Sequence, residues 1–171
     1  VLEKKDENLK DAWFARCEPV ASVKGKTALV IGAGVAGLAT AGELAKNGLK
    51  VVIAEAKSEV ATNGSGNHCG ALMPLVTKPG VNLGRMHINA FLQAVRFYKA
   101  NLPKSLIKFN GCIDSAFDDE LVKRYASWQD QNAEDLFKFD ESLKPYPGIF
   151  IKEAAYARPR EICKFLSGGF E

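Results

Sequence analysis

The chain has 171 residues, of which 47% are hydrophobic and 25% charged, so it is neither disordered nor fibrous. Two complete domains of roughly 100–200 residues each do not fit into this length. The net charge of +3 is too small to indicate a nucleic-acid partner by itself.

The cysteines and the apolar runs narrow the class of protein further. The four cysteines form no CxxC pair, so we predict neither a metal site nor a disulfide framework. No apolar run approaches the roughly 20 residues that cross a bilayer. We therefore expect a cytoplasmic protein that does not enter a membrane.

Residues 1–25 are predicted to form a linker or interdomain segment. Nine of the first eighteen residues are charged, which is too polar for a core element. Trp13 and Phe14 are the exception, and we expect them to anchor this segment against a domain surface because large aromatic side chains are unfavourable in water. The alternative is an aromatic pair that only patches an exposed edge.

A strand, a helix and a second strand are predicted next. The continuous apolar run 27–31 predicts a strand buried on both faces of a parallel sheet. Apolar residues at helical spacing predict a helix over 35–47, which Gly48 ends. Residues 50–54 predict a second buried strand. Residues 27–55 therefore form one βαβ unit.

The remaining chain is predicted to be a long loop followed by mixed elements. Residues 56–83 sustain no helical or strand period, and a loop of this length is usually functional. The other predicted elements are a helix over 85–100, a half-buried strand over 112–117, a helix over 118–131, a turn at 145–148, a hairpin pairing 149–151 with 154–157, and a last helix that Pro159 opens and that ends before Gly168.

A glycine-rich turn joins the first predicted strand to its helix. It reads Gly32-Ala33-Gly34-Val35-Ala36-Gly37, a GxGxxG in the strand-to-helix context that dinucleotide binding requires. Gly32 allows the sharp turn, Gly34 allows backbone N–H groups to approach a pyrophosphate, and Gly37 allows the helix to pack close to the sheet. We expect the whole turn to contact the cofactor.

A carboxylate follows the second predicted strand. Glu55 lies eighteen residues after Gly37, where it can accept hydrogen bonds from an adenosine ribose, with Ala56 beside it. The pattern predicts adenine-dinucleotide binding, and a purely structural βαβ unit is the alternative. The spacing does not distinguish NAD from FAD.

The loop after Glu55 favours FAD. Ser65, Gly66 and Asn67 can lay backbone N–H groups and small polar side chains against the pyrophosphate, the ribityl chain and the ring edge of a flavin. A surface loop without a ligand is the alternative.

These motifs resemble those of the D-amino-acid-oxidase-like FAD-dependent oxidoreductases. The resemblance rests on the fingerprint from Gly32 to Glu55, on residues 64–75, and on matching stretches as far as 158–162. Within this family the chain is most similar to the oxidase halves of bifunctional enzymes that modify the wobble uridine of tRNA. The resemblance adds His68, Gly70, Ala71, Leu72 and Met73 to the residues expected around the flavin.

The resemblance also implies a fold and an activity. The fold is α/β: a Rossmann-like FAD/NAD(P)-binding βαβ core with the beginning of a mixed-sheet substrate domain, incomplete. Residues 26–171 would be the N-terminal part of a truncated FAD-dependent oxidase domain, inactive alone and without catalytic residues that can be named. The complete enzyme would remove the carboxymethyl group from 5-carboxymethylaminomethyl(-2-thio)uridine in tRNA and would carry a covalently linked methyltransferase half upstream.

Two other functions stay open at this point. One is an amine oxidase of the same chemistry that acts on a small molecule such as glycine or sarcosine. The other is a dinucleotide-binding module without a reaction of its own.

Overall fold

A computed structural model describes residues 22–131, 133 and 135–170. Trp13, Phe14 and most of the predicted linker lie outside the described residues. The elements in chain order are β1 (Thr27–Ile31), α1 (Val35–Lys46), β2 (Lys50–Ala54), the 3-10 turn η2 (Gly64–Gly66), β3 (Gly70–Leu72), α2 (Asn82–Asn101), β4 (Ile107–Lys108), β5 (Cys112–Ser115), α3 (Asp119–Ala126), the 3-10 turn η3 (Gln129–Gln131), β6 (Phe137–Asp140), β7 (Gly148–Ile151), β8 (Ala155–Ala157) and α4 (Pro159–Ser167).

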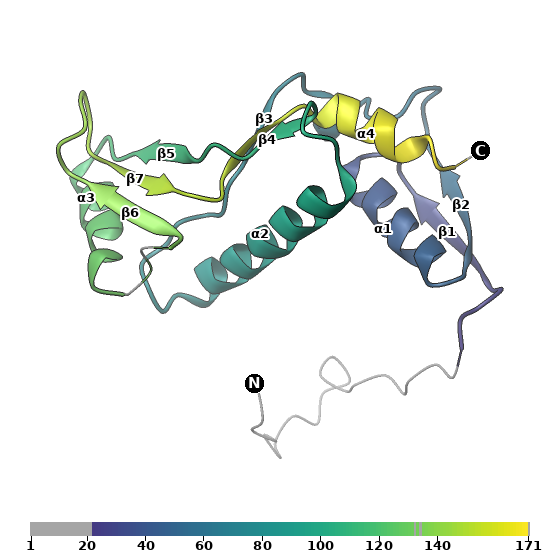
Figure 1. The fold of residues 1–171 in the computed structure, drawn as a ribbon, viewed down its shortest axis with the longest axis horizontal. Coiled ribbons are helices and arrows are strands. Elements are labelled where there is room, and N and C mark those ends of the chain that lie inside the picture. Colours follow the sequence, from purple (N-terminus) through teal and green to yellow (C-terminus); the bar gives the residue numbers. More distant parts are fainter. Residues whose placement is uncertain (1–21, 132, 134, 171) are drawn as a thin grey trace, which may run out of the picture.

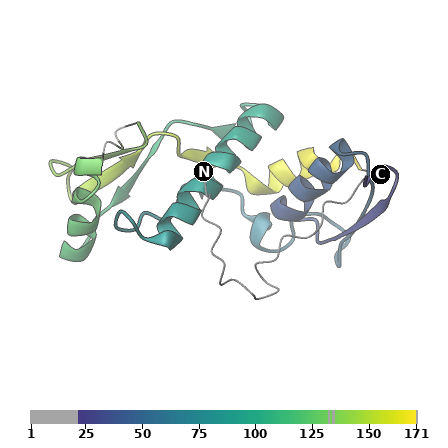
Figure 2. The ribbon, with the colours of Figure 1, turned by 90° about the horizontal axis from the view of Figure 1, so that it is seen from below.

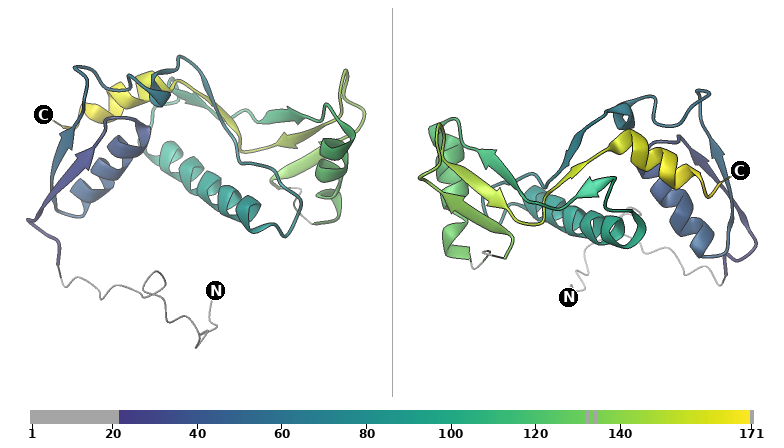
Figure 3. Two further views of the ribbon diagram at one scale, coloured as in Figure 1. Left: turned by 180° about the vertical axis from the view of Figure 1, so that it is seen from behind. Right: turned by 45° about the horizontal axis from the view of Figure 1, so that its top comes forward.

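The described residues form an elongated molecule with two ends joined by α2. Figures 1 and 2 show β1, α1, β2 and α4 at one end, and β5, β6, β7 and α3 at the other. The third sheet, with the order β3-β8-β4, lies near the end of α2 that approaches α1 (Figure 3). The fold is thus α/β with mixed pairing, as predicted.

The βαβ unit is the best-predicted part of the fold. β1 and β2 pair in parallel with Thr27 opposite Lys50, and both strands have the predicted bounds. α1 ends at Lys46, and Gly48 follows with a positive φ of 84°, donating its N–H to the carbonyl of Ala45 at 2.9 Å. Because glycine adopts this left-handed conformation without strain, it stops the helix where the sequence indicates.

One face of the β1–β2 sheet is uncovered among the described residues. Val30 points toward α1 and is buried, whereas Leu29, Ile31 and Val52 on the other face are 62%, 83% and 52% exposed. The prediction of strands buried on both faces is therefore wrong for the described residues. The physical reason is that successive side chains of a strand point to opposite faces, and α1 covers only one of them.

α4 packs against α1 and completes the layer above the sheet. Cys163 of α4 is fully buried beside Leu38 of α1 and Ala61 of the loop after β2. α4 has the predicted limits, since Pro159 occupies its first turn, where no N–H is needed, and it ends before Gly168.

The strands after α2 pair differently from the prediction. β7 lies between β5 and β6 in an antiparallel sheet, whereas β8 lies between β3 and β4 in another. The predicted hairpin of 149–151 with 154–157 is therefore wrong. Each of the two strands buries its side chains against partners far away in sequence, which the local pattern does not reveal.

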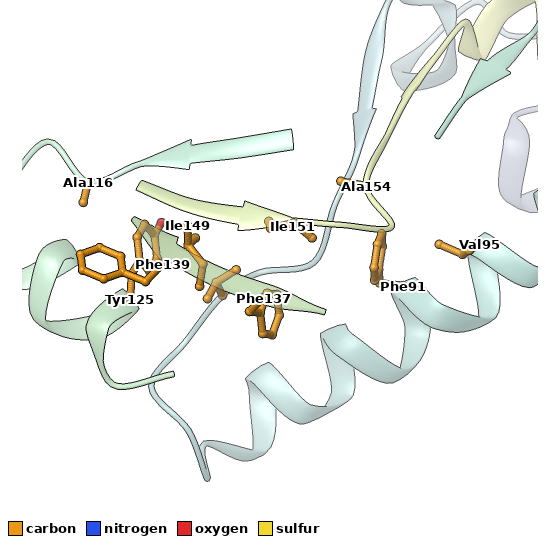
Figure 4. Close-up of a cluster of buried hydrophobic side chains, with 10 residues drawn as sticks. Phe91, Val95, Ala116, Tyr125, Phe137, Phe139, Ile149, Ile151 and Ala154 are labelled. Atoms are coloured by element: carbon orange, nitrogen blue, oxygen red, sulfur yellow. The ribbon is translucent and has the colours of Figure 1, made fainter. Parts of the chain in front are cut away.

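The largest hydrophobic cluster fills the space between the β5-β7-β6 sheet, α3 and α2. Figure 4 shows Phe137 and Ile151 between the sheet and α2, and Phe91 of α2 pointing toward Ala154. Ile149 and Ile151 are fully buried. This cluster packs α2 against the sheet and so fixes the position of β7, the strand that precedes β8 in the chain.

Helix ends deviate from the sequence-based bounds by a few residues. α2 begins three residues before position 85 and α3 ends at Ala126, five residues before position 131. Asp118 precedes α3 and accepts the N–H of Leu121 at 2.8 Å, a side-chain cap at the predicted start.

Candidate functional site

The glycine turn between β1 and α1 requires glycine for steric reasons. Gly32 has a φ of 98° and donates its N–H to the carbonyl of Ala54 at 2.7 Å, so the turn is tied to β2. A Cβ on Gly37 would lie 2.0 Å from the carbonyl oxygen of Gly32. No side chain fits there, and α1 therefore begins directly against the turn.

The beginning of α1 has no capping side chain of its own. Gly34 is the N-cap in an extended conformation, so the cap has no side chain that could accept an N–H, and the first turn holds no acidic residue. The partial positive charge of a helix N-terminus favours an anion at this place. Gly34, Ala36 and Gly37 surround this end as the sequence predicts.

Glu55 lies beside the turn rather than pointing into solvent. Its Oε2 accepts the N–H of Ala33 at 2.7 Å, and its Oε1 accepts the N–H of Lys57 at 3.2 Å. Hydrogen bonds from Ala33 first, then from Lys57, hold the pKa of this carboxyl below its ordinary value. Glu55 thus carries a negative charge at the end of β2, and Ala56 after it is exposed.

The predicted flavin loop contacts the start of α1 through Ser65. Its Oγ accepts the N–H of Val35 at 3.1 Å, and a Cβ on Gly34 would lie 3.1 Å from the same oxygen. The N–H of Ala61 is 3.2 Å from the carbonyl of Ala33 and holds the loop at a second point. Gly66 is required there, because a Cβ would lie 2.5 Å from the carbonyl oxygen of Ala61.

A small cavity lies between this loop, β3 and α4. Its volume is about 170 Å³. The predicted residues that line it are Val35, Ser65, Gly70, Ala71 and Leu72, and the others are Gly64, Tyr98, Ala157, Pro159 and Ile162. The cavity therefore extends from the start of α1 to β3.

Other predicted residues lie outside this cavity. Asn67 and His68 are exposed, although the carbonyl of Asn67 accepts the N–H of Arg160 at 3.4 Å and so contacts the start of α4. Met73 is half-buried and packs on the large hydrophobic cluster instead. The flavin-side residues thus divide between the cavity, the surface and the core.

The cavity also contains residues that the sequence did not single out. Tyr98 comes from α2, Ala157 from β8, and Pro159 and Ile162 from α4. Pro159 indicates the start of a helix, and the stretch 158–162 resembles the family, but neither feature shows which elements lie next to it. Burial raises the pKa of the Cys163 thiol in α4, and a hydrogen bond with Ser65 opposes that shift.

The family follows from a match that covers most of the chain. Residues 27–171 match the family DAO, FAD dependent oxidoreductase. The chain belongs to this family. FAD is therefore the cofactor of its class, which resolves the choice between NAD and FAD that the spacing left open.

The chain is similar in sequence to bifunctional tRNA-modifying proteins. The chain is 94% identical over all 171 residues to the tRNA 5-methylaminomethyl-2-thiouridine biosynthesis bifunctional protein MnmC of Campylobacter concisus, and covers 28% of it. It is 35% identical over 154 residues to MnmC of Hahella chejuensis, with 87% of this chain and 24% of that protein covered. The chain thus spans about a quarter of the length of these family members.

Solved structures share the fold at low sequence identity. Fructosyl peptide oxidase from E. terrenum has a TM-score of 0.69 at 15% identity, over 88% of this chain and 39% of that one. L-proline dehydrogenase from P. horikoshii has a TM-score of 0.64 at 21% identity, over 86% and 41%. The predicted family and fold class are confirmed.

Among the residues that the structure describes, no helix is both long enough and apolar enough to cross a membrane.

Proposed function

We propose that residues 26–171 are the N-terminal part of the oxidase domain of a bifunctional tRNA-modifying enzyme. Its substrate would be 5-carboxymethylaminomethyl(-2-thio)uridine at the wobble position. The observation that supports the cofactor site is the start of α1, where the N-cap is glycine and the first turn has no acidic residue, with Glu55 beside it. The substrate assignment is supported by the 94% identity to the protein from C. concisus.

The residues at the turn fit the ADP part of FAD. A Cβ on Gly37 would clash with the Gly32 carbonyl oxygen at 2.0 Å, and one on Gly34 would lie only 3.1 Å from the Ser65 hydroxyl. Glycine at these positions keeps the turn compact, and a diphosphate would approach its backbone N–H groups. Glu55 would accept the ribose hydroxyls, because its depressed pKa keeps it ionised at neutral pH. Ala33, Val35, Ala36 and Ala56 complete this part by their backbone.

The flavin side would follow the loop and β3. Ser65 and the strand Gly70–Leu72 line the cavity that continues from the helix start, and they would contact the ribityl chain and the ring edge. Gly66 and Asn67 are assigned to this side by the composition of the loop, and His68 and Met73 by the family resemblance. Removing Ser65 would also release the N–H of Val35 to a ligand.

The proposed reaction oxidises a carbon–nitrogen bond. FAD, when bound, supplies the acceptor for the hydride that leaves the carboxymethyl carbon, after which water hydrolyses the C=N bond to free the aminomethyl uridine and glyoxylate. The described residues would bind and orient the cofactor for this step. The second activity would belong to a covalently linked methyltransferase half upstream, and the tRNA substrate would place the enzyme in the cytoplasm.

The experiment that tests the substrate uses the whole purified protein. It is incubated with tRNA that carries carboxymethylaminomethyl uridine, and nucleosides are quantified by mass spectrometry, while glycine and sarcosine are offered in parallel with peroxide detection. We expect loss of the carboxymethyl group from tRNA and negligible peroxide from the amino acids. Equal oxidation of glycine would replace the tRNA assignment by the small-molecule one.

The cofactor part is tested separately by colour. The whole protein should purify yellow, and heat denaturation should release FAD. A colourless protein whose melting temperature rises with NAD instead would favour the dinucleotide-binding module without a reaction.

A further inference from the structure

A second hollow lies on α1, away from the glycine turn. It has a volume of about 530 Å³. We call it the α1 groove, and its lining residues are Val23, Ala39, Thr40, Glu43, Leu44, Asn47, Leu49 and Phe97. Four of them lie in α1 between Ala39 and Leu44, whereas the cofactor cavity includes Val35 at the helix start. No lining residue is shared, so the α1 groove is separate from the cofactor cavity.

The α1 groove is apolar at its base and polar at its rim. Leu44, Leu49 and Phe97 are half-buried, so part of each apolar side chain still faces the hollow. Glu43 at the rim is paired with Lys46 at 2.7 Å and needs no further partner. Such a surface favours an apolar or aromatic occupant over a charged one.

The chain itself provides a matching segment close by. Val23 lines the groove, and the described residues begin one position before it, at residue 22. Trp13 and Phe14, nine residues before Val23, are the only aromatic residues in the first 21 positions. A segment of this length reaches at most about 30 Å, enough to fold back along α1, and a short tether gives a millimolar-range effective concentration.

We propose that Trp13 and Phe14 occupy the α1 groove. Two aromatic side chains bury roughly 150–250 Å² each, which suits a hollow of this size and explains why two large aromatics are tolerated in so polar a segment. The segment before β1 would then be fixed along α1 instead of serving as a free tether. This inference does not depend on the proposed function.

The test measures how well the groove is covered in the whole protein. Thr40 is exposed and lines the groove, so the substitution T40C places a thiol there. The rate at which maleimide labels this thiol is measured by peptide mass spectrometry. We expect labelling to become about tenfold faster when Trp13→Ala and Phe14→Ala are added, because the cover is lost. The matched control is K123C on α3 at the other end of the molecule, whose labelling should not change.

Three outcomes would overturn the proposal. Fast labelling of T40C in both backgrounds would mean an open groove, and slow labelling in both would mean that another part of the protein covers it. Protection that disappears on dilution and does not need Trp13 would mean that a second copy covers it. Unchanged flavin absorbance in each variant shows that the domain is still folded.

A second measurement changes the groove instead of the aromatic pair. Ala39→Glu places a charge among the apolar lining residues without touching the aromatic pair. We expect tryptic cleavage after Arg16 to become several-fold faster, because the displaced segment is open to the protease. Cleavage at the parental rate would contradict the proposal.

Discussion

Steric constraints at single glycines make the cofactor turn directly testable. A Cβ on Gly37 would lie 2.0 Å from the Gly32 carbonyl oxygen, whereas Gly42, also in α1, has nothing within 4 Å of its virtual Cβ. We expect Gly37→Ala to displace the helix start and abolish FAD retention in the whole protein. Gly42→Ala should instead stabilise it by about 0.5–1 kcal/mol, since alanine is the better helix former.

Flavin absorbance after gel filtration and the melting temperature measure both variants. Because the two substitutions add the same methyl group to the same helix, their difference isolates the close approach at the turn. Retention of FAD by Gly37→Ala would refute the steric argument.

Glu55 predicts a specific dependence of stability on pH. Its pKa is held below the ordinary value of 4.5 by the Ala33 and Lys57 N–H groups. A carboxyl with a depressed folded-state pKa contributes stability that is fully present above 4.5 and is lost as the pH falls through the lower folded value. We therefore expect the melting-temperature difference between wild type and Glu55→Gln to be constant near neutral pH and to shrink below pH 4.5.

Differential scanning fluorimetry from pH 3 to 7 checks this expectation at about half-unit steps. Other carboxylates titrate alike in both proteins, so they cancel in the difference. A difference that stays the same at every pH would mean that the charge of Glu55 does not contribute.

At the scale of elements, local patterns predicted what local contacts determine. β1, α1, β2 and α4 follow from apolar runs, helical spacing and the residues that start or stop a helix, such as Gly48 and Pro159. β6, β4 and β3 were missed. β3 and β4 are only three and two residues long, and no periodic pattern can be recognised in so few residues.

Strand pairing could not be predicted from the sequence because it depends on partners that are far apart along the chain. Cys112 pairs with Ile151 and Gly70 with Ala157, so each pair joins residues separated by dozens of positions. Only three residues separate β7 from β8, which is a typical hairpin spacing, yet the chain uses them to cross from one sheet to another. Nothing in the local alternation distinguishes these two solutions.

One hydrogen bond ties α3 to the sheet and supports a stability prediction. The Tyr125 hydroxyl donates to Asp114 on β5 at 2.7 Å, and burial together with this bond raises the pKa of Tyr125. We expect Tyr125→Phe to lower the free energy of unfolding by about 1–2 kcal/mol, because a partly buried bond to a carboxylate is lost. Tyr146, an exposed residue, provides the control, and Tyr146→Phe should change it by less than about 0.5 kcal/mol.

Urea unfolding followed by circular dichroism measures both tyrosine variants. Each substitution keeps the aromatic ring and removes only the hydroxyl. The change in the free energy of unfolding therefore reports the contribution of that hydroxyl. Equal effects of the two substitutions would show that the Asp114 bond contributes nothing measurable.

At the scale of the whole molecule, the site combines predictable and unpredictable parts. The turn and Glu55 lie within a single βαβ unit, so sequence spacing alone brings them together. The cavity wall requires α2, β8 and α4 to meet. Tyr98 precedes the strands of the β5-β7-β6 sheet in the sequence and Pro159 follows them, so the two residues are far apart along the chain. Only the assembled fold reveals such residues.

The uncovered face of the β1–β2 sheet leads to a last prediction, which concerns the chain of residues 1–171 by itself. Leu29, Ile31 and Val52 form a contiguous apolar surface among the described residues, and parallel strands are normally buried on both faces. We expect this chain to bind the dye ANS, because the dye fluoresces on exposed apolar surface. Replacing Leu29 and Ile31 by threonine should remove most of the signal, since threonine is smaller and carries a polar hydroxyl, while its β-branched side chain is still favoured in strands.

A matched substitution separates this face from exposed apolar residues in general. Phe117 is also well exposed but lies at the far end of the molecule, beyond β5, so Phe117→Ser should leave most of the fluorescence. The relative from C. concisus is about three and a half times as long as this chain, which covers 28% of it. In a whole protein of that kind the same face should bind little dye if later residues cover it. Strong and equal dye binding by both forms would mean that the face stays open, and the assignment of these strands to a sheet buried on both sides would then fail for the complete domain as well.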